Sequence, residues 1–270
     1  QYGMAYRADF NGAQQEGVGL YRTYQQGGQR CSNARAYLWP ISTRSNLTTV
    51  TDAQVQRVVL SGKRATGVQY TCKGQLFEAH ATREVLLCAG TFHSPQLLML
   101  SGIGPADTLR KQGIPIVHEL PGVGENLQDH LDVVLVVRAK DRQPISFHPA
   151  ELWRWTKALY RYMRFKQGEL TSNLAEAGAF LKSQPAEPLP DLQLHFLPLP
   201  ATRHGLNLWT AVRDYAYSIM VYDLRPLSRG RVTLASKDPQ DPPLIDPNYG
   251  ACQRDIDRLV LGIQHARHIA

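Results

Sequence analysis

A short run of consecutive apolar residues lies near the end of the first third of the chain. Residues 85–88 (VLLC) are continuously apolar, which predicts a strand buried on both faces of a sheet. The small residues Ala89 and Gly90 follow, and they would let another backbone or a ligand approach closely. Ser94 and Pro95 then predict the N-cap and first position of a helix that the next glycine ends. A strand, a small-residue turn and a helix N-terminus are typical of an anion-binding crevice in an α/β sheet.

The same reading along the chain predicts further strands and helices. β-Branched or alternating segments predict strands, and glycine-containing turns separate several of them into hairpins. The predicted strands are 47–50, 55–60, 65–72, 76–81, 133–137, 176–181, 192–197, 217–224 and 230–235. The predicted helices are 105–113, 148–165 and 255–270. From residue 133 onward, this pattern predicts an antiparallel sheet with helices on one face.

The predicted helix 148–165 has apolar residues at helical spacing. We expect this stripe to face the core rather than a cofactor. It consists of Leu152, Trp155, Leu159, Tyr162 and Met163.

Composition places the chain among globular proteins. Of 270 residues, 43% are hydrophobic and 20% are charged, and no run approaches the about 18 consecutive apolar residues of a membrane helix. The formal net charge of +7 comes from 30 basic and 23 acidic residues. The basic residues are scattered and form no nucleic-acid motif, so we expect a generally basic surface and no nucleic-acid partner.

Cysteine usage and the chain ends add two expectations. The four cysteines include no CxxC pair, which favours a reducing compartment over a zinc site or a disulfide framework. The chain begins at Gln1 rather than Met, and its last predicted helix reaches Ala270 without a stop signal. We therefore expect an internal piece of a longer protein.

Three patches carry a resemblance to a known family. The first is GTFHSPQLLMLSGIG at 90–104, the second is PGVGENLQDH at 121–130, and the third is LRPLSRGRVTLASKDPQDPPLIDPNY at 224–249. Together with DFNG at 9–12 and RSNL at 44–47, they resemble the glucose-methanol-choline (GMC) flavoprotein oxidoreductases, and choline-dehydrogenase-like enzymes in particular. The resemblance covers essentially the whole chain.

The resemblance implies an α+β fold in two parts. Residues 1–132 would form an incomplete α/β FAD-binding domain, and residues 133–270 a truncated antiparallel-sheet substrate domain. Val55 would contribute to the adenine end of FAD, and Ala89 and Gly90 would also lie at the cofactor. Glu176, in the run AEAGAF, would place a carboxylate in the substrate cavity, although an exposed strand charge is an equal interpretation.

The resemblance also implies an activity and exposes two missing parts. GMC enzymes oxidise an alcohol by hydride transfer to flavin, with a histidine near the C-terminus as base. This sequence has no GxGxxG after a predicted strand, and the expected catalytic histidine would lie beyond Ala270. We therefore assign no catalytic residue, and we interpret Asp129 and His130 as structural although an acid can orient a histidine as a base. His265 and His268 lack an acid and make a poor metal site, so we predict none.

The expected function is that of a part of an FAD-dependent oxidoreductase acting on a primary alcohol, either choline-like or aliphatic. By itself the chain would hold FAD weakly and be inactive. The alternative is an FAD-free, non-catalytic module that binds a small molecule or a partner. The expected location is cytoplasmic, and peripheral contact of the parent protein with the inner membrane or a quinone stays open.

Overall fold

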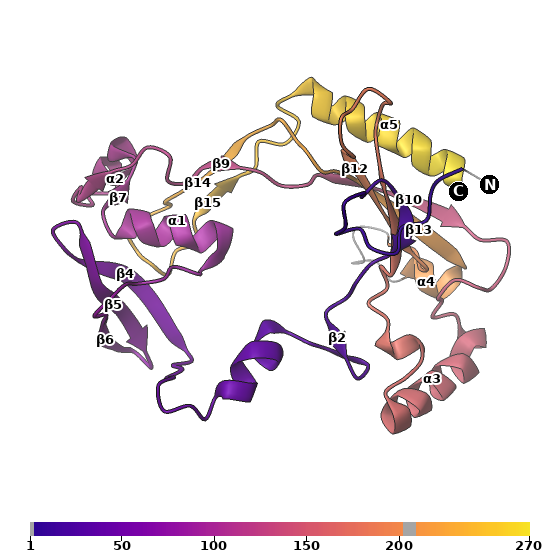
Figure 1. The fold of residues 1–270 in the computed structure, drawn as a ribbon, viewed down its shortest axis with the longest axis horizontal. Helices are drawn as coiled ribbons and strands as arrows, with labels where there is room; N and C mark the ends of the chain where they lie inside the picture. The colour runs from indigo at the N-terminus through magenta and orange to yellow at the C-terminus, as the bar shows by residue number, and fades with distance from the viewer. Residues whose placement is uncertain (1–2, 202–208) are drawn as a thin grey trace. The chain divides into compact units, whose positions relative to one another are not determined.

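The computed structural model describes residues 3–201 and 209–270, and the chain divides into two compact units (Figure 1). Unit 1 comprises Gln1–Leu47, His130–Pro226 and Gln253–Ala270, and unit 2 comprises Thr48–Asp129 and Leu227–Cys252. Each unit is thus assembled from segments that are distant in the sequence. The expected functional domains, 1–132 and 133–270, follow a single cut in the chain and stay a prediction.

Unit 1 is built on a five-stranded antiparallel sheet in the order β1-β11-β12-β13-β10. Its strands are β1 (Gly17–Leu20), β10 (Asp132–Arg138), β11 (Ala177–Leu181), β12 (Leu192–Leu197) and β13 (Ala216–Asp223). The four predicted strands after residue 132 that belong to this sheet are confirmed within one residue at each end. The antiparallel arrangement expected for this half of the chain is confirmed as well.

Helix α5 (Gln253–Ile269) covers one face of this sheet (Figure 1). Ala266 of α5 packs into a core formed with buried strand residues, among them Leu192 and Val221. At Gly262 the helix approaches the sheet so closely that an added Cβ would lie 2.4 Å from Val221 Cγ1. This close packing closes the hydrophobic core of unit 1 on that side.

A buried ionic cluster fastens α5 to the strand ends. The Arg258 side chain is buried, with Nε 3.2 Å from Asp191 Oδ2 and Nη1 3.6 Å from Asp223 Oδ1. Asp191 also accepts hydrogen bonds of 2.6 Å from the backbone N–H and the hydroxyl of Ser183. Burial raises the pKa of Asp223, although Arg258 and the Arg225 N–H favour its charged form. Charges placed this deeply require partners, so α5 and the sheet depend on each other.

Unit 1 contains further, smaller elements outside the sheet. They are β2 (Gln25–Gln26), β3 (Gln29–Arg30), the short helical turns Ala34–Leu38, Trp39–Ile41, Pro149–Glu151 and Glu169–Thr171, and the helices α3 (Leu152–Phe165) and α4 (Trp209–Arg213). Strands β2 and β3 form a small antiparallel hairpin.

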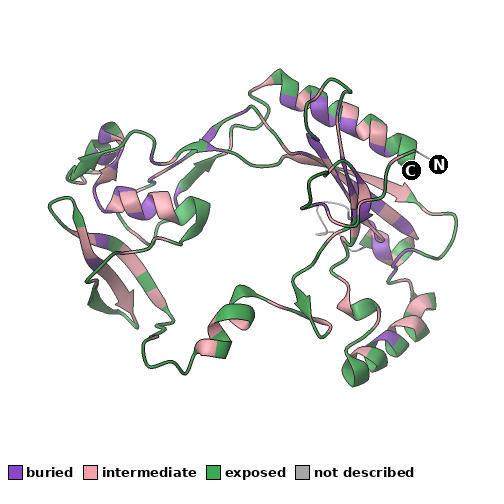
Figure 2. Ribbon diagram, viewed as in Figure 1, coloured by how far each residue is buried: buried purple, intermediate pink, exposed green. Residues whose placement is uncertain are grey.

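The prediction that the apolar stripe of α3 faces the core was wrong. Leu152 is 69% exposed, Leu159 50% and Met163 70%, while Trp155 and Tyr162 are half-buried (Figure 2). Ala158 is the buried residue of the helix, and Trp155 of the predicted stripe contacts the rest of unit 1 through a 2.9 Å hydrogen bond from Nε1 to the Ser146 carbonyl. The amphipathic spacing correctly gave the helix, but it could not say which element would cover the apolar stripe.

Unit 2 begins with a three-stranded antiparallel sheet, β4 (Ala53–Ser61), β5 (Arg64–Cys72) and β6 (Gln75–His80). The three predicted strands at 55–60, 65–72 and 76–81 are confirmed. The predicted strand at 47–50 was wrong, since these residues form a turn and an irregular segment without a pairing strand.

Helix α1 (Gly90–Leu100) packs against β4, where the Val58 N–H donates a 2.8 Å hydrogen bond to Ser101 Oγ. The helix begins five residues before the predicted first position, so Pro95 lies inside it and not at its start. A proline at this point cannot donate a hydrogen bond to the Thr91 carbonyl, and its ring crowds that carbonyl, so it is tolerated here at a cost in helix stability.

The rest of unit 2 continues from α1. Its elements are β7 (Ile103–Gly104), α2 (Ala106–Lys111), β8 (His118–Glu119), β9 (Glu125–Leu127), β14 (Gly230–Thr233) and β15 (Leu244–Asp246). Strands β7 and β8 pair in parallel, and β15-β14-β9 form an antiparallel sheet. A small core of Met99, Leu109, Val123 and Leu234 joins α1 and α2 to this sheet.

The expected buried strand at 85–88 was also wrong. The segment is irregular, and no strand within 3–201 and 209–270 pairs with it. Leu86 is 74% exposed and Cys88 is exposed. A central strand needs neighbours on both edges to satisfy its backbone, and the described part of the chain supplies none here.

Candidate functional site

The candidate cofactor site of unit 2 lies at the N-terminus of α1. Ala89 is the N-cap residue, and no side chain caps the helix or places an acid in its first turn. Gly90 has φ +80°, and a Cβ added there would meet nothing within 4 Å. The first turn therefore presents uncapped backbone N–H groups beside open space, an arrangement that suits a negatively charged group.

Two cavities meet at this helix end. One cavity of about 320 Å³ is lined by Ala89 and Gly90 together with His93, Asp129 and neighbouring residues. In its wall, the Tyr249 hydroxyl donates a hydrogen bond to Asp129 Oδ2. Asp129, which we interpreted as structural, thus joins two segments of unit 2.

The second cavity, of about 380 Å³, is mostly apolar. Val55 of β4 and Ala89 both line it, with the irregular run 84–88 and Leu97 of α1. The structure thus brings two of the three predicted cofactor residues to one cavity and places Gly90 at its neighbour. The sequence resemblance named all three, and their roles stay a prediction.

These residues fit one portion of an FAD molecule. An uncapped helix N-terminus suits phosphate, and an apolar cavity beside a valine suits a planar ring. The glycine-rich loop that usually cradles a pyrophosphate is absent from the sequence. The fit therefore concerns only the groups that would meet Val55, Ala89 and Gly90.

Glu176 stands apart from these cavities. It directly precedes β11, and its backbone carbonyl accepts a 2.8 Å hydrogen bond from the Tyr21 N–H. None of the cavities described in this section is lined by Glu176. Its role in substrate binding stays a prediction.

Unit 1 contains an aromatic and polar cluster that sequence reasoning missed. The His195 ring lies 4.9 Å from the Tyr21 ring and 4.8 Å from the Tyr222 ring, centroid to centroid. The Gln193 side chain donates a 3.1 Å hydrogen bond to the Tyr21 hydroxyl. Gln193 and His195 alternate with buried Leu192 and Leu194 along β12, so they point away from α5. In the sequence, the alternation of these polar residues with leucines is the signal that could have placed them together on one face of the sheet.

Burial changes the proton affinity of this cluster. It raises the pKa of Tyr21 to about 12 and also raises the pKa of Tyr222. It lowers the pKa of His195, against the opposing influence of Asp132. At neutral pH the cluster therefore holds uncharged rings that can donate or accept hydrogen bonds.

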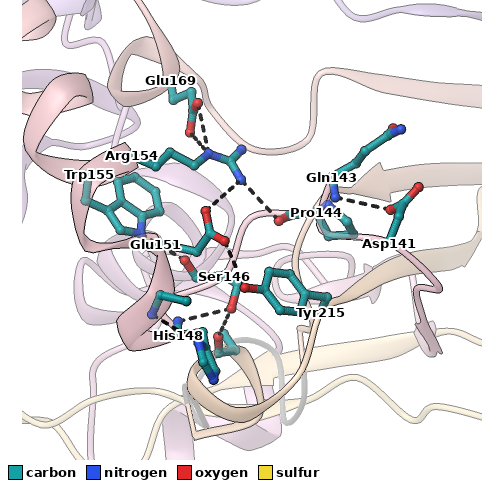
Figure 3. Close-up of polar contacts among 12 residues, drawn as sticks. Asp141, Gln143, Pro144, Ser146, His148, Glu151, Arg154, Trp155, Glu169 and Tyr215 are labelled. Atoms are coloured by element: carbon teal, nitrogen blue, oxygen red, sulfur yellow. Dashed lines mark hydrogen bonds and ion pairs between the residues drawn. The ribbon is translucent and has the colours of Figure 1, made fainter.

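An apolar cavity of about 480 Å³ lies between α3 and the sheet of unit 1. It is lined by Ile145, Phe147, Trp155, Glu169, Leu170, Ser172, Leu174, Leu197, Leu199, Ala201 and Met220. Among the described lining residues only Glu169 is ionisable, and it accepts a 2.9 Å hydrogen bond from Arg154 Nε (Figure 3). The cavity thus offers an apolar wall and a carboxylate that is already paired.

Comparisons with known proteins cover nearly the whole chain. Family models described as GMC oxidoreductase match residues 1–132 and 226–270. An alcohol dehydrogenase [acceptor] of Pseudomonas putida is 44% identical over 268 residues, 98% of this chain and 48% of its own length. Human mitochondrial choline dehydrogenase is 41% identical over 281 residues, 100% of this chain and 45% of its own length. The chain spans about half the length of these relatives.

Solved structures show the same fold. Pyridoxine 4-oxidase from Mesorbium loti superposes with a TM-score of 0.82 at 26% identity, over 98% of this chain and 48% of that one. A formate oxidase superposes with a TM-score of 0.86 at 25% identity, over 98% and 50%. The mixed α+β fold expected from the sequence is confirmed.

Proposed function

Because the chain belongs to the GMC oxidoreductase family, we propose that it forms part of an FAD-dependent enzyme that oxidises a primary alcohol. The observation that carries this proposal is the meeting of Val55 and Ala89 on one cavity at an uncapped helix N-terminus. When bound, the flavin supplies the oxidising chemistry by accepting a hydride from the CH–OH carbon. The residues of this chain supply position and electrostatics.

Each site residue has a distinct task in this proposal. The first-turn N–H groups of α1 hold a negative group of the cofactor, since no side chain among the described residues caps them. Gly90 leaves room for close approach, because no atom lies within 4 Å of the position of a Cβ. Val55 forms part of an apolar wall that excludes water from a ring. The catalytic base would come from outside this chain.

We propose an aliphatic alcohol as the substrate in preference to a choline-like one. The cavity under α3 is almost entirely apolar, and its carboxylate, Glu169, is neutralised by Arg154. A quaternary ammonium group would require an unpaired carboxylate or an open aromatic cage. Glu176 would have to provide that charge from outside this cavity for choline to be preferred.

The test compares two variants of the full-length protein. Val55→Arg places a charged side chain at the apolar cavity, whereas Val50→Arg changes a residue that is already 52% exposed. We expect the purified V55R protein to retain less than about a tenth of the flavin, because burying an unpaired charge costs several kcal/mol. V50R should keep its flavin. Equal flavin content in the two correctly folded variants would contradict the assignment of Val55.

Substrate preference is tested on the full-length protein under anaerobic conditions. A medium-chain primary alcohol should bleach the flavin absorbance faster than choline at equal concentration. Faster bleaching by choline would overturn the aliphatic assignment. A colourless full-length protein that binds alcohol without FAD would instead favour the non-catalytic alternative.

A further inference from the structure

Helix α3 is held to unit 1 along one side. Its buried residue Ala158 is 6% exposed, and Trp155 Nε1 donates a 2.9 Å hydrogen bond to the Ser146 carbonyl. Glu151, just before the helix, accepts a 2.8 Å hydrogen bond from the Tyr215 hydroxyl (Figure 3). Arg154 extends this network to Glu169. With its N-terminal half fastened in this way, the helix keeps the opposite side turned outward.

The outward side of α3 is apolar and aromatic. We define the outer face of α3 as five residues that are each at least half exposed. They are Leu152 (69%), Trp153 (76%), Leu159 (50%), Tyr160 (64%) and Met163 (70%). At about 100° per residue these positions lie on one arc of the helix, in which the exposed Thr156 is the polar residue. Phe165, at the end of the helix, adds a further ring that is 54% exposed.

Basic residues flank this arc and no acid interrupts it. Residues 152–166 contain five basic side chains and no aspartate or glutamate. Arg154 is taken up by the network around Glu169. The other four form no ion pair with any residue that the structure describes; they are Lys157, Arg161, Arg164 and Lys166. Lys157, Arg161 and Arg164 follow Trp153 and Tyr160 around the helix, on the polar side of the arc.

We propose that the outer face of α3 binds the surface of a bilayer that contains anionic phospholipids. An apolar arc with Trp and Tyr suits the boundary between headgroups and acyl chains, where amphipathic rings are favoured. The unpaired basic side chains would meet lipid phosphates, and their long stems let the charge reach outward while the ring edges insert. The basic side chains along one side of the arc, and the lack of any acid in residues 152–166, favour this anionic surface over a protein partner, because charged residues are depleted at the core of protein interfaces.

The helix would lie on the surface and not cross it. Its 14 residues rise only about 21 Å, less than the hydrocarbon thickness. No helix in the described parts of the chain is long and apolar enough to span a membrane. Binding of the outer face of α3 to a bilayer requires neither flavin nor the alcohol substrate.

The test is co-sedimentation of the chain, and of the full-length protein, with phospholipid vesicles. Both should bind vesicles of phosphatidylcholine and phosphatidylglycerol in equal parts, and should bind pure phosphatidylcholine about a hundredfold more weakly. Replacing Lys157, Arg161 and Arg164 by Gln should lower binding to the anionic vesicles by about a hundredfold. Replacing Trp153, Tyr160 and Met163 by Ser should lower it by at least about tenfold, and this loss should persist at high salt.

Matched controls remove three basic or three exposed apolar and aromatic side chains elsewhere. For charge, the control is Lys63→Gln, Lys73→Gln and Arg83→Gln, all at exposed positions of unit 2. For the apolar face, it is Tyr37→Ser, Trp39→Ser and Leu76→Ser, each more than half exposed. Both controls should bind like the unmodified chain, with folding checked by circular dichroism.

Three results would overturn the proposal. The first is absence of binding to anionic vesicles. The second is an equal loss in the α3 variants and their controls, which would indicate only a general basic surface. The third is binding by the chain but not by the full-length protein, which would mean that other parts of the polypeptide cover the outer face of α3.

Discussion

Units 1 and 2 treat their apolar segments differently. In unit 1, the apolar residues of the central strands lie between paired neighbours and beneath α5, and Leu192 and Val221 are 0% exposed. In unit 2, the apolar run 85–88 has no pairing strand among the described residues, and Leu86 is 74% exposed. The predicted cofactor residues Val55 and Ala89 line the cavity beside this open run.

The difference shows which unit covers its apolar surface with residues of this chain. Unit 1 closes its sheet on the α5 side with residues of its own, including the buried cluster of Arg258. Unit 2 leaves open the apolar surface next to the candidate flavin site. The expected result is that core substitutions in unit 1 destabilise the chain, while substitutions in the open run act on cofactor binding by the full-length protein.

The largest effect is expected from Arg258→Ala in unit 1. It would leave the buried carboxylates of Asp191 and Asp223 without their cation, at a cost of about 3–5 kcal/mol in the free energy of unfolding. All four tryptophans lie in unit 1, so urea unfolding followed by tryptophan fluorescence reports on this unit. The control is Arg254→Ala, which removes an exposed partner of Glu187 and should cost at most about 1 kcal/mol. Equal losses would show that the buried cluster contributes no more than a surface pair.

A paired substitution sharpens the comparison between the units. Leu192→Ala should cost about 2–5 kcal/mol, because the side chain is fully buried against α5. Leu86→Ala should change the free energy of unfolding by no more than about 0.5 kcal/mol, because this side chain is already in solvent. Urea unfolding followed by far-ultraviolet circular dichroism detects both units. A large loss for L86A would mean that the run 84–88 is packed after all.

Gly90→Ala gives a smaller effect on stability and a separate one on the cofactor. Alanine at φ +80° costs roughly 1–2 kcal/mol, although its Cβ would contact nothing in this chain. In the full-length protein, we expect G90A to weaken flavin binding, measured by flavin fluorescence on titration of the apoprotein. Gly113→Ala, also at positive φ and without atoms near its Cβ, is the matched control and should leave flavin binding unchanged.

The smallest effect is the pH dependence that His195 confers on unit 1. Burial lowers the pKa of His195 in the folded state below its unfolded value of about 6.5. The unfolded chain therefore binds more protons as the pH falls through that value, and unit 1 loses stability. His195→Gln should make the fluorescence-detected stability fall less between neutral and mildly acidic pH. An unchanged slope would show that His195 is not the group responsible.

The sequence predicted most of the sheets because their signals are local. Alternation and turn glycines located β4, β5 and β6, and β-branched runs located β10 and β13. It failed at 85–88 because four apolar residues indicate a buried strand only if neighbouring strands exist. It failed for the stripe of α3 because helical spacing defines an apolar side without identifying what covers it. Both failures concern long-range contacts.

For the candidate sites, too, local sequence signals were sufficient where long-range contacts were not needed. The resemblance to GMC enzymes named Val55, Ala89 and Gly90, and the structure brings them to adjoining cavities. Neither spacing nor resemblance indicated the ring cluster of Tyr21, His195 and Tyr222, since its members are far apart in the sequence. In the sequence, a polar residue that alternates with buried ones cannot be told from a residue that faces water. Only the fold places His195 between two tyrosines.

The most direct measurement is the visible absorption spectrum of the purified chain after incubation with excess FAD and desalting, beside the full-length protein treated in the same way. We predict a colourless chain and a yellow full-length protein, because Val55, Ala89 and Gly90 provide only part of the cofactor site. Flavin bands near about 380 and 450 nm retained by the chain would contradict this, and would mean that these residues suffice to hold the cofactor. A colourless full-length protein would contradict the flavoenzyme assignment itself.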